Sequence, residues 1–193
     1  AMREPRAPSP QAFLPRRQTR AGPPAPKRFP SGLHVTTNGG LPRRIASAIL
    51  YLKSRYGTLA DARYSRKGPQ PQSTIDEIAE EMGSLFTEDA VWEGGGPLGT
   101  ATGRDEIRDR FRAPTLQYSW HFFVKPEIRV DGDHATGVWD VLAMMTTHEG
   151  RAMWMVGVEH DEYRRVGGEG PHLPMQLDSK RTRADHKGWG TAP

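Results

Sequence analysis

The sequence predicts an α+β domain in which N-terminal helices precede a curved, mainly antiparallel sheet that forms a cone-shaped barrel. Before residue 87, apolar residues recur every three or four positions, which is typical of amphipathic helices. After residue 117 the chain changes to long apolar segments separated by turns that contain glycine, which is typical of hairpins. Both faces of the middle segment, 134–147, are apolar, so each face should be covered. Helices would cover one face, and the other would line a concave interior or an oligomer interface.

Residues 1–42 are predicted to form a disordered tail rich in proline and arginine. Residues 1–44 hold nine of the 17 prolines, nine of the 27 Lys/Arg residues and one of the 23 acidic residues. This composition buries too little apolar surface to offset chain entropy. Without this segment the chain is slightly acidic, so its high pI does not argue for nucleic-acid binding. The tail alone could contact phosphates, although a solvated extension is the simpler interpretation.

The domain is expected to occupy residues 43–193 and to begin with a helix near Pro42, a residue suited to a first helical turn. One face of this helix is apolar: Ile45, Ile49, Leu52, Tyr56 and Leu59. The segment 68–71 (GPQP) predicts a break. A second helix follows, with Thr74 and Glu77 spaced as a capping box. Its predicted apolar face consists of Ile75, Ile78, Met82, Leu85 and Phe86.

The remaining elements are read from alternation and from turns. Residues 90–92 predict a short strand, 94–99 a glycine-rich loop without the lysine of a phosphate-binding loop, and 103–111 a short helix. Three longer strands are expected at 118–130, 134–147 and 151–166, joined by hairpin turns at 131–133 and 148–150. A last strand is expected at 173–183.

Several classes of protein are excluded or disfavoured by composition. The absence of cysteine excludes disulfides, thiolate nucleophiles and cysteine-ligated metal sites. No apolar run reaches the roughly 20 residues of a membrane span, and no Sec signal is evident. No metal-binding motif is found. We therefore expect a cytoplasmic protein that uses neither a metal nor a cofactor.

Two strand residues are unusual for a sheet interior. His121 has apolar neighbours and shares its strand face with Ser119 and Phe123. A histidine that faces a cavity acts as a base near neutral pH, although a hydrogen-bonded core histidine is the simpler interpretation. Asp140 lies in the middle of an apolar strand, where an unpaired carboxylate is costly. It should pair with His, Arg or Tyr, or contact a ligand.

Three further residues have both a functional and a structural interpretation. Tyr56 and Asp61 are five positions apart, about 140° around a regular helix, so they flank one cavity only if the helix end crosses its mouth. Otherwise Tyr56 is a core residue and Asp61 is solvated near a helix C-terminus, where negative charge is disfavoured. Arg165, near a strand end, is either a pocket residue or a solvated charge at the rim.

Four segments of the sequence resemble the SnoaL-like domains of the nuclear-transport-factor-2-like superfamily. They are 85–92 (LFTEDAVW), 103–107 (GRDEI), 130–137 (VDGDHATG) and 161–165 (DEYRR). The resemblance covers roughly residues 43–193. It implies a cone-shaped α+β barrel with a deep apolar pocket for a small apolar ligand, and usually a homo-dimer or homo-trimer.

Within this superfamily the sequence is most similar to the branch that holds bile acid 7α-dehydratase, scytalone dehydratase and hexachlorocyclohexane dehydrochlorinase. Those enzymes eliminate water or HCl from a ring with a His–Asp pair. The resemblance of 55–61 (RYGTLAD) implies that Asp61 is the partner carboxylate and Tyr56 a catalytic tyrosine. It also implies that His121 is the catalytic histidine and Asp140 a further polar residue of the pocket. We predict that Trp92, Phe123, Trp139, Leu142, Met144, Trp154 and Arg165 bind the substrate, and Arg165 matches a pocket arginine of the family only loosely.

The favoured hypothesis is a cofactor-free lyase acting on a small apolar, hydroxylated ring. His121 would abstract a proton next to the leaving group, Asp61 would orient the imidazole, and Tyr56 or Asp140 would assist the departing oxygen. An isomerase or cyclase would use the same base without a leaving group.

The alternative hypothesis is a non-catalytic domain that binds a ligand or mediates assembly. Two departures from the family pattern favour it. Residues 65–74 resemble an insertion, and Pro171 and Pro174 weaken the last strand, which normally helps to close the pocket.

Overall fold

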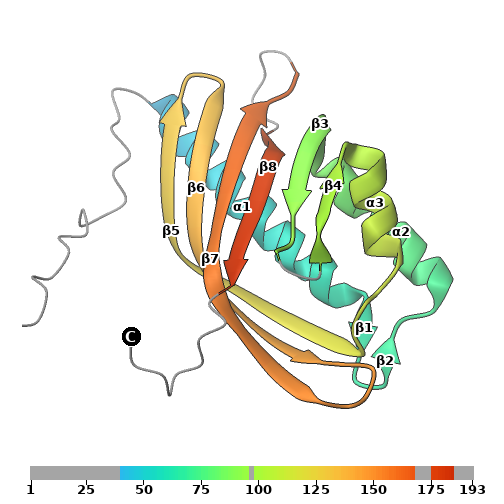
Figure 1. Cartoon of the computed structure of the whole chain (residues 1–193). Helices are drawn as coiled ribbons and strands as arrows, with labels where there is room; N and C mark the ends of the chain where they lie inside the picture. Colours follow the sequence, from blue (N-terminus) through green and yellow to red (C-terminus); the bar gives the residue numbers. More distant parts are fainter. Residues whose placement is uncertain (1–39, 96–97, 168–174, 185–193) are drawn as a thin grey trace, which may run out of the picture. The chain divides into compact units, whose positions relative to one another are not determined.

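The computed structural model describes residues 40–95, 98–167 and 175–184, all within the compact unit 32–193. The prediction of a disordered tail therefore falls almost wholly outside the described residues, as do Pro171 and Pro174. The α+β class is confirmed: helices gather in the first half of the described chain, and a six-stranded sheet forms most of the second (Figure 1).

The three helices are α1 (Gly40–Ala62), α2 (Gln72–Ser84) and α3 (Arg104–Arg112). The apolar face predicted for α1 is buried throughout, from Ile45 to Leu59. The predicted capping box is wrong: Pro71 is the N-cap of α2 without a side-chain hydrogen bond. Thr74 is therefore already inside the helix, because the fixed φ of the proline starts the helix earlier than the Thr–Glu spacing suggested.

Helix α2 ends earlier than the spacing of its apolar residues suggested. The helix ends at Ser84, and Phe86, expected on its apolar face, begins strand β3 (Phe86–Glu93). Phe86 is nevertheless fully buried. Residue spacing alone could not show whether Phe86 ends the helix or begins the strand, because its side chain reaches the same core from either element.

Three short strands were not predicted because each has too few residues to show alternation. Strands β1 (Tyr64–Ser65) and β2 (Gly68–Pro69) form a small antiparallel pair within the segment interpreted as an insertion. Strand β4 (Thr100–Thr102) pairs antiparallel with β3.

The large sheet contains the predicted meander and a strand that closes it. Strands β5 (Tyr118–Asp131), β6 (His134–Thr146), β7 (Ala152–Arg165) and β8 (Met175–Ala184) confirm the predicted segments. The strand order is β4-β3-β8-β7-β6-β5, so β4 and β5 are its two edges. Strand β8 lies parallel to β3 and antiparallel to β7, and all other neighbours are antiparallel.

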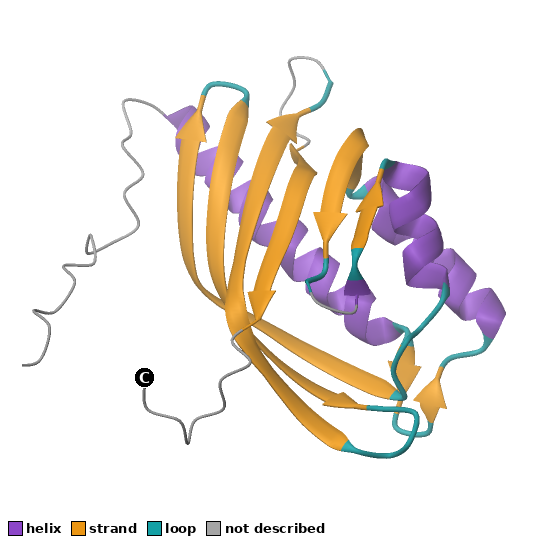
Figure 2. Ribbon diagram, in the orientation of Figure 1, coloured by secondary structure: helices purple, strands orange, loops and turns teal. Residues whose placement is uncertain are grey.

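The long strands of the meander bend strongly near their middle (Figure 2). On β5 the pairing with β6 shifts between Val124 and Glu127, and Lys125 has a φ of 51°. A bulge of this kind bends a strand and increases its twist. The curved sheet wraps around α1, which contacts β5 and β8 on the concave side.

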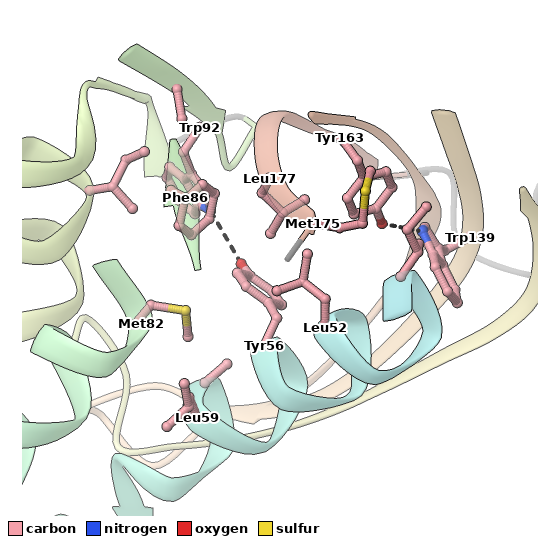
Figure 3. Packing of buried hydrophobic residues seen from close by; sticks show 14 of the residues in the cluster. Leu52, Tyr56, Leu59, Met82, Phe86, Trp92, Trp139, Tyr163, Met175 and Leu177 are labelled. Atoms are coloured by element: carbon pink, nitrogen blue, oxygen red, sulfur yellow. Dashed lines mark hydrogen bonds between the residues drawn. The ribbon is translucent and has the colours of Figure 1, made fainter. Parts of the chain in front are cut away.

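The core lies between α1 and the concave face of the sheet (Figure 3). Tyr56 of α1 lies among Phe86, Phe111 and Phe123 in edge-to-face contacts with centroid distances of 5.9–6.2 Å. Such geometry is favourable for aromatic rings. The chain thereby fills the interior of the cone largely with its own side chains.

No described element of the single chain covers the outer face of the sheet, so of the two expected coverings an oligomer interface stays a prediction for this face. Trp120, Met144 and Trp154 lie side by side on β5, β6 and β7, and Trp154 is 67% exposed. Phe122 and Leu142 form the next row. Among the described helices, none combines the length and the apolar character that a membrane span requires. The described part of the chain thus leaves an apolar outer face accessible.

Candidate functional site

The imidazole of His121 lies against the carboxylate of Asp61. Asp61 lies in the last turn of α1, and its Oδ1 is 2.6 Å from Nδ1 of His121. The backbone N–H of His121 donates to both carboxylate oxygens, at 3.1 and 3.0 Å. The side chains of His121 and Asp61 are 19% and 16% exposed. When Nδ1 carries the proton toward Asp61, Nε2 is the basic nitrogen of the ring.

The local structure explains why an acid occurs at this helix end. A carboxylate near a helix C-terminus is unfavourable in isolation. Strand β5 is an edge strand, so backbone N–H groups on its free side need other acceptors. Asp61 accepts from one of these groups and also contacts the imidazole. The carboxylate thus has a structural role that would exist without any chemistry.

Phe123 holds the other side of the imidazole. Its ring is parallel to that of His121 within 3°, with centroids 6.0 Å apart. Gly57 allows α1 to approach closely, because a Cβ there would lie 3.1 Å from Phe123 Cε2. Lys53 Nζ lies 4.3 Å from the centroid of the Phe123 ring, a distance favourable for a cation–π contact.

An open cleft of about 680 Å³ lies between α1 and β5 beside this pair. Both His121 and Asp61 line it. Leu50, Phe123 and Trp139 contribute apolar walls. Pockets for small organic ligands typically have volumes of roughly 300–1,000 Å³ and such mixed walls. The cleft therefore suits a ring-sized molecule.

A second, smaller cavity of about 90 Å³ lies deeper in the cone. His121 and Phe123 line both spaces, so they stand between the cleft and the inner cavity. Tyr56, Trp92 and Lys180 line only the inner cavity. The imidazole therefore borders the open cleft on one side and the smaller inner cavity on the other.

A buried charged cluster lies behind the inner cavity, and sequence analysis missed it. We call Lys53, Glu159, Asp161 and Lys180 the core charge cluster; each is at most 3% exposed. Lys53 Nζ contacts Glu159 and lies 2.8 Å from Asp161 Oδ2. Lys180 Nζ lies 3.1 Å from Glu159 Oε2. Strand parity on β7 was the available signal, since Glu159 and Asp161 share a face with the buried Tyr163.

The pKa values of the two carboxyl groups in the core charge cluster are shifted in opposite directions. Burial opposes ionisation of Glu159, but the charges of Lys180 and Lys53 outweigh it and lower its pKa to about 2. Burial raises the pKa of Asp161, and the neighbouring Glu159 adds to this effect although Lys53 opposes it. Tyr163 donates a hydrogen bond to Asp161 at 2.7 Å.

Tyr56 does not reach the His–Asp pair through a hydrogen bond in the structure. Its hydroxyl accepts from Trp92 Nε1 at 3.2 Å (Figure 3). Burial raises the pKa of Tyr56 well above its ordinary value. The tyrosine lines the inner cavity with Trp92, as expected if it belongs to the core.

Asp140 is the clearest correction. It lies on the outer face of the sheet, its side chain is 42% exposed, and it pairs with Lys125 rather than with His, Arg or Tyr. The prediction of burial assumed that both sheet faces are covered. Because no described element covers the outer face, the carboxylate is partly exposed, and it lies outside both cavities.

The predicted substrate-binding residues lie partly at the two cavities and partly on the outer face of the sheet. Phe123 and Trp139 line the cleft, and Trp92 lines the inner cavity. Leu142, Met144 and Trp154 lie on the outer face and line neither space. The pocket prediction is therefore wrong for these three, since strand parity turns them away from His121.

Arg165 pairs with Asp133 at the far end of the sheet, and no described residue of the cleft or inner cavity contacts it. This is the rim charge of the simpler interpretation. Within residues 40–95, 98–167 and 175–184, no group of three His, Cys, Asp or Glu residues is placed to hold a metal ion.

The model of the SnoaL-like domain family matches residues 73–169. His121 lies within the match, whereas Asp61 precedes it. No curated protein has a significantly similar sequence.

Solved structures share the fold at low identity. A type 3 hexachlorocyclohexane dehydrochlorinase from Novosphingobium barchaimii is 21% identical, with a TM-score of 0.58 over 78% of this chain and 97% of that one. An NTF2-like superfamily protein from Salmonella enterica is 15% identical, with a TM-score of 0.57 over 78% and 99%. ActVI-ORFA from Streptomyces coelicolor is 15% identical, with a TM-score of 0.52 over 74% and 98%. These likenesses confirm the predicted fold.

Proposed function

Because the chain belongs to the SnoaL-like domain family, we propose that it is a cofactor-free acid–base enzyme of the lyase or isomerase type. The observation that carries the proposal is the 2.6 Å contact between Asp61 Oδ1 and His121 Nδ1 at the wall of an open cleft. A carboxylate in this position fixes the imidazole tautomer and stabilises the imidazolium when it forms. The dehydrochlorinase among the structural neighbours provides an analogy for elimination from a ring.

In the proposed elimination, Nε2 of His121 removes a proton from a ring carbon, and the electrons of that C–H bond form a C=C bond. The leaving group departs from the adjacent carbon with its bonding electrons. A departing hydroxyl group takes a proton to leave as water, and the imidazolium of His121 can return one. Asp140 has no part in this step, because it lies outside the cleft. Tyr56 could act only on a group that reaches the inner cavity.

The dimensions and walls of the cleft limit the substrate to a small, largely apolar ring that carries a hydroxyl or another leaving group. Leu50, Phe123 and Trp139 would contact its apolar faces. An isomerase would use the same base and return the proton to another carbon.

The assignment is tested with purified protein and a panel of hydroxylated and chlorinated six-membered rings, followed by mass spectrometry for loss of water or HCl. Positioned acid–base groups typically contribute about 10²–10⁴-fold each. His121→Ala should therefore lower turnover by at least about 100-fold, and Asp140→Asn is the matched control that should leave it unchanged. An active His121→Ala variant with the wild-type rate would rule the assignment out.

A second candidate function, assembly, is favoured by the open outer face. Trp120, Phe122 and Trp154 are 47%, 42% and 67% exposed. Contiguous apolar surface of this kind marks interaction sites. We propose that this face binds a second copy of the chain in a homo-dimer or homo-trimer.

Sedimentation of the wild-type protein should therefore show an oligomer, and Trp154→Glu should shift it to monomer. A wild-type monomer at micromolar concentration would contradict the assembly proposal and leave the enzyme proposal unaffected.

A further inference from the structure

We propose that the inner cavity is a subsite for a carboxylate carried by the ligand, bound by Arg63, Ser119 and Lys180 beside His121. This proposal rests on the proposed function, because the bound ligand is a substrate only if the protein is an enzyme. It narrows the substrate class to small rings that carry a carboxylate. Three observations carry it: an unpartnered buried hydroxyl, an arginine without an ion pair, and an excess of cationic side chains around one small space.

The hydroxyl of Ser119 lacks a partner. Ser119 is 1% exposed and lines the inner cavity. Its Oγ makes no hydrogen bond to any described residue. Buried polar groups in proteins are normally hydrogen-bonded, and leaving one unpaired destabilises the fold. Because Ser119 lines the inner cavity, an acceptor bound there would supply the partner that its hydroxyl lacks.

Arg63 contributes a guanidinium that has no carboxylate partner. Its Nε donates to the carbonyl of Ala60 at 3.1 Å and its Nη1 to that of Phe111 at 3.4 Å. Among the described residues, no carboxylate lies within ion-pair distance of it. A guanidinium carries five N–H donors, so it retains donors for a ligand. Arginine suits carboxylates because its fork matches their two oxygens.

The wall of the inner cavity is cationic overall. Among its described residues, Arg63, Arg110 and Lys180 are basic, and Glu159 is the only acid. Glu159 is already bound by Lys53 and Lys180 of the core charge cluster. Lys180 also donates to Thr182 Oγ1 at 2.7 Å, which holds its ammonium in place. The two arginines are therefore not neutralised by an acid of this wall, and a ligand carboxylate would neutralise one of them.

The position of the subsite fits the chemistry at His121. Ser119 and His121 lie two residues apart on the same face of β5, and both line the inner cavity. One water needs about 10–15 Å³ of such space, so 90 Å³ holds a carboxylate with its waters but not a ring in addition. The ring would therefore stay in the cleft, with its carboxylate reaching past Phe123. This arrangement would hold a ring carbon at the imidazole.

The test uses the full chain and benzoate as the probe, with benzamide as its neutral counterpart. Binding is followed by isothermal titration and by the tryptophan fluorescence expected to report on Trp92, which lines the inner cavity. We expect benzoate to bind at least about 10-fold more tightly than benzamide, since a charged hydrogen bond contributes roughly 1.5–3 kcal/mol. Equal affinity for the two probes, as a buried water at Ser119 would give, overturns the proposal.

Two variants locate the binding. Arg63→Gln and Ser119→Ala should each weaken benzoate by about 10-fold or more. Ser119→Ala should also melt at or above the wild-type temperature, because it removes an unpartnered hydroxyl, so weaker binding in it cannot reflect unfolding. Lys125→Ala, on the outer face, is the control with unchanged affinity. Unchanged benzoate affinity in Ser119→Ala and Arg63→Gln overturns the proposal.

The subsite and the enzyme assignment can fail separately. Benzoate selectivity that persists in an inactive His121→Ala variant supports both. Benzoate selectivity together with full turnover in His121→Ala removes the lyase and keeps the subsite. Loss of turnover in His121→Ala together with no preference for benzoate keeps the acid–base role and removes the subsite.

Discussion

Two charged regions face each other across Phe123, and they differ in how their charges are balanced. In the core charge cluster, Lys53 contacts both Glu159 and Asp161, and solvent reaches none of them. At the cleft, the carboxylate of Asp61 faces a neutral or protonated imidazole and remains partly exposed. In the enclosed cluster every charge depends on a partner, whereas the open pair can change protonation without leaving a buried charge. The first region is suited to stability and the second to chemistry.

The largest effect is expected from Lys53→Met. This change leaves Glu159 with one lysine and Asp161 with none, and breaking a buried pair from one side typically costs about 3–5 kcal/mol. Urea unfolding of both proteins at pH 7 measures the difference. A loss below about 1 kcal/mol would contradict the view that the cluster is held together by mutual compensation. Arg55→Met is the matched control, because it removes an ion pair with Glu81 at the surface. It should change the free energy of unfolding by less than about 1 kcal/mol.

The next effect concerns acid stability. The folded-state pKa of Glu159 is lowered from 4.5 to about 2, so its stabilisation is present above pH 4.5 and lost as the pH falls toward 2. Glu159→Gln should flatten this decline, which amounts to a few kcal/mol at about 1.4 kcal/mol per pKa unit. Free energies of unfolding between pH 2 and 6 provide the measurement.

Asp161 is the internal comparison for that experiment. Its pKa is raised from 3.8, so its ionisation favours the unfolded state as the pH rises above 3.8. Asp161→Asn should therefore leave the decline below pH 4.5 in place. An equal flattening in both variants would show that the two carboxyl groups are not tuned in opposite directions.

A smaller stability effect, of about 1–2 kcal/mol, is expected from Asp61→Asn. The amide keeps one acceptor oxygen but turns donors toward His121, whose backbone N–H and imidazole both contact the carboxylate. In the same variant the nitrogen-15 chemical shifts of the imidazole should move, because the tautomer loses its partner. Unchanged chemical shifts would mean that Asp61 binds only the backbone N–H of His121 and does not set the tautomer of the imidazole.

The smallest effect is expected from Lys125→Ala. This residue pairs with Asp140 on the outer face, with side chains 78% and 42% exposed. Exposed pairs typically contribute about 0–1 kcal/mol, so the melting temperature should hardly change. A loss above about 1 kcal/mol would show that this pair is not solvent-exposed in solution.

The long elements of the fold were predictable because their patterns are repeated many times. Five apolar positions define the buried face of α1, and the three strands of the meander each exceed ten residues. Strands β1, β2 and β4 were missed because two or three residues show no period, and β3 was shortened because its first residue, Phe86, continues the apolar spacing of α2. The Thr74 cap failed for a related reason: the local Thr–Glu spacing competed with Pro71, three positions earlier, which is the N-cap of α2.

The site was predictable only in part. The structure places Asp61 and His121 in contact, and their catalytic roles stay predictions. Asp140 was misplaced because sequence periodicity gives the two faces of a strand but not which face is covered. Glu159 and Asp161 were missed because strand parity alone, without a nearby partner, does not separate a buried acid from a solvated one, and Lys53 lies more than 100 positions from both acids.

The parallel pairing of β3 with β8 has a consequence for the order of folding. Strand β8 lies between β3 and β7, so it alone joins the β3–β4 hairpin to the meander. Helices and hairpins form from neighbours in the chain, but this junction closes a loop of more than 80 residues between Phe86 and Leu177. The two halves of the sheet can therefore join only after Met175–Ala184 has been synthesised, and until then the edges of β3 and β7 that pair with β8 have no strand partner.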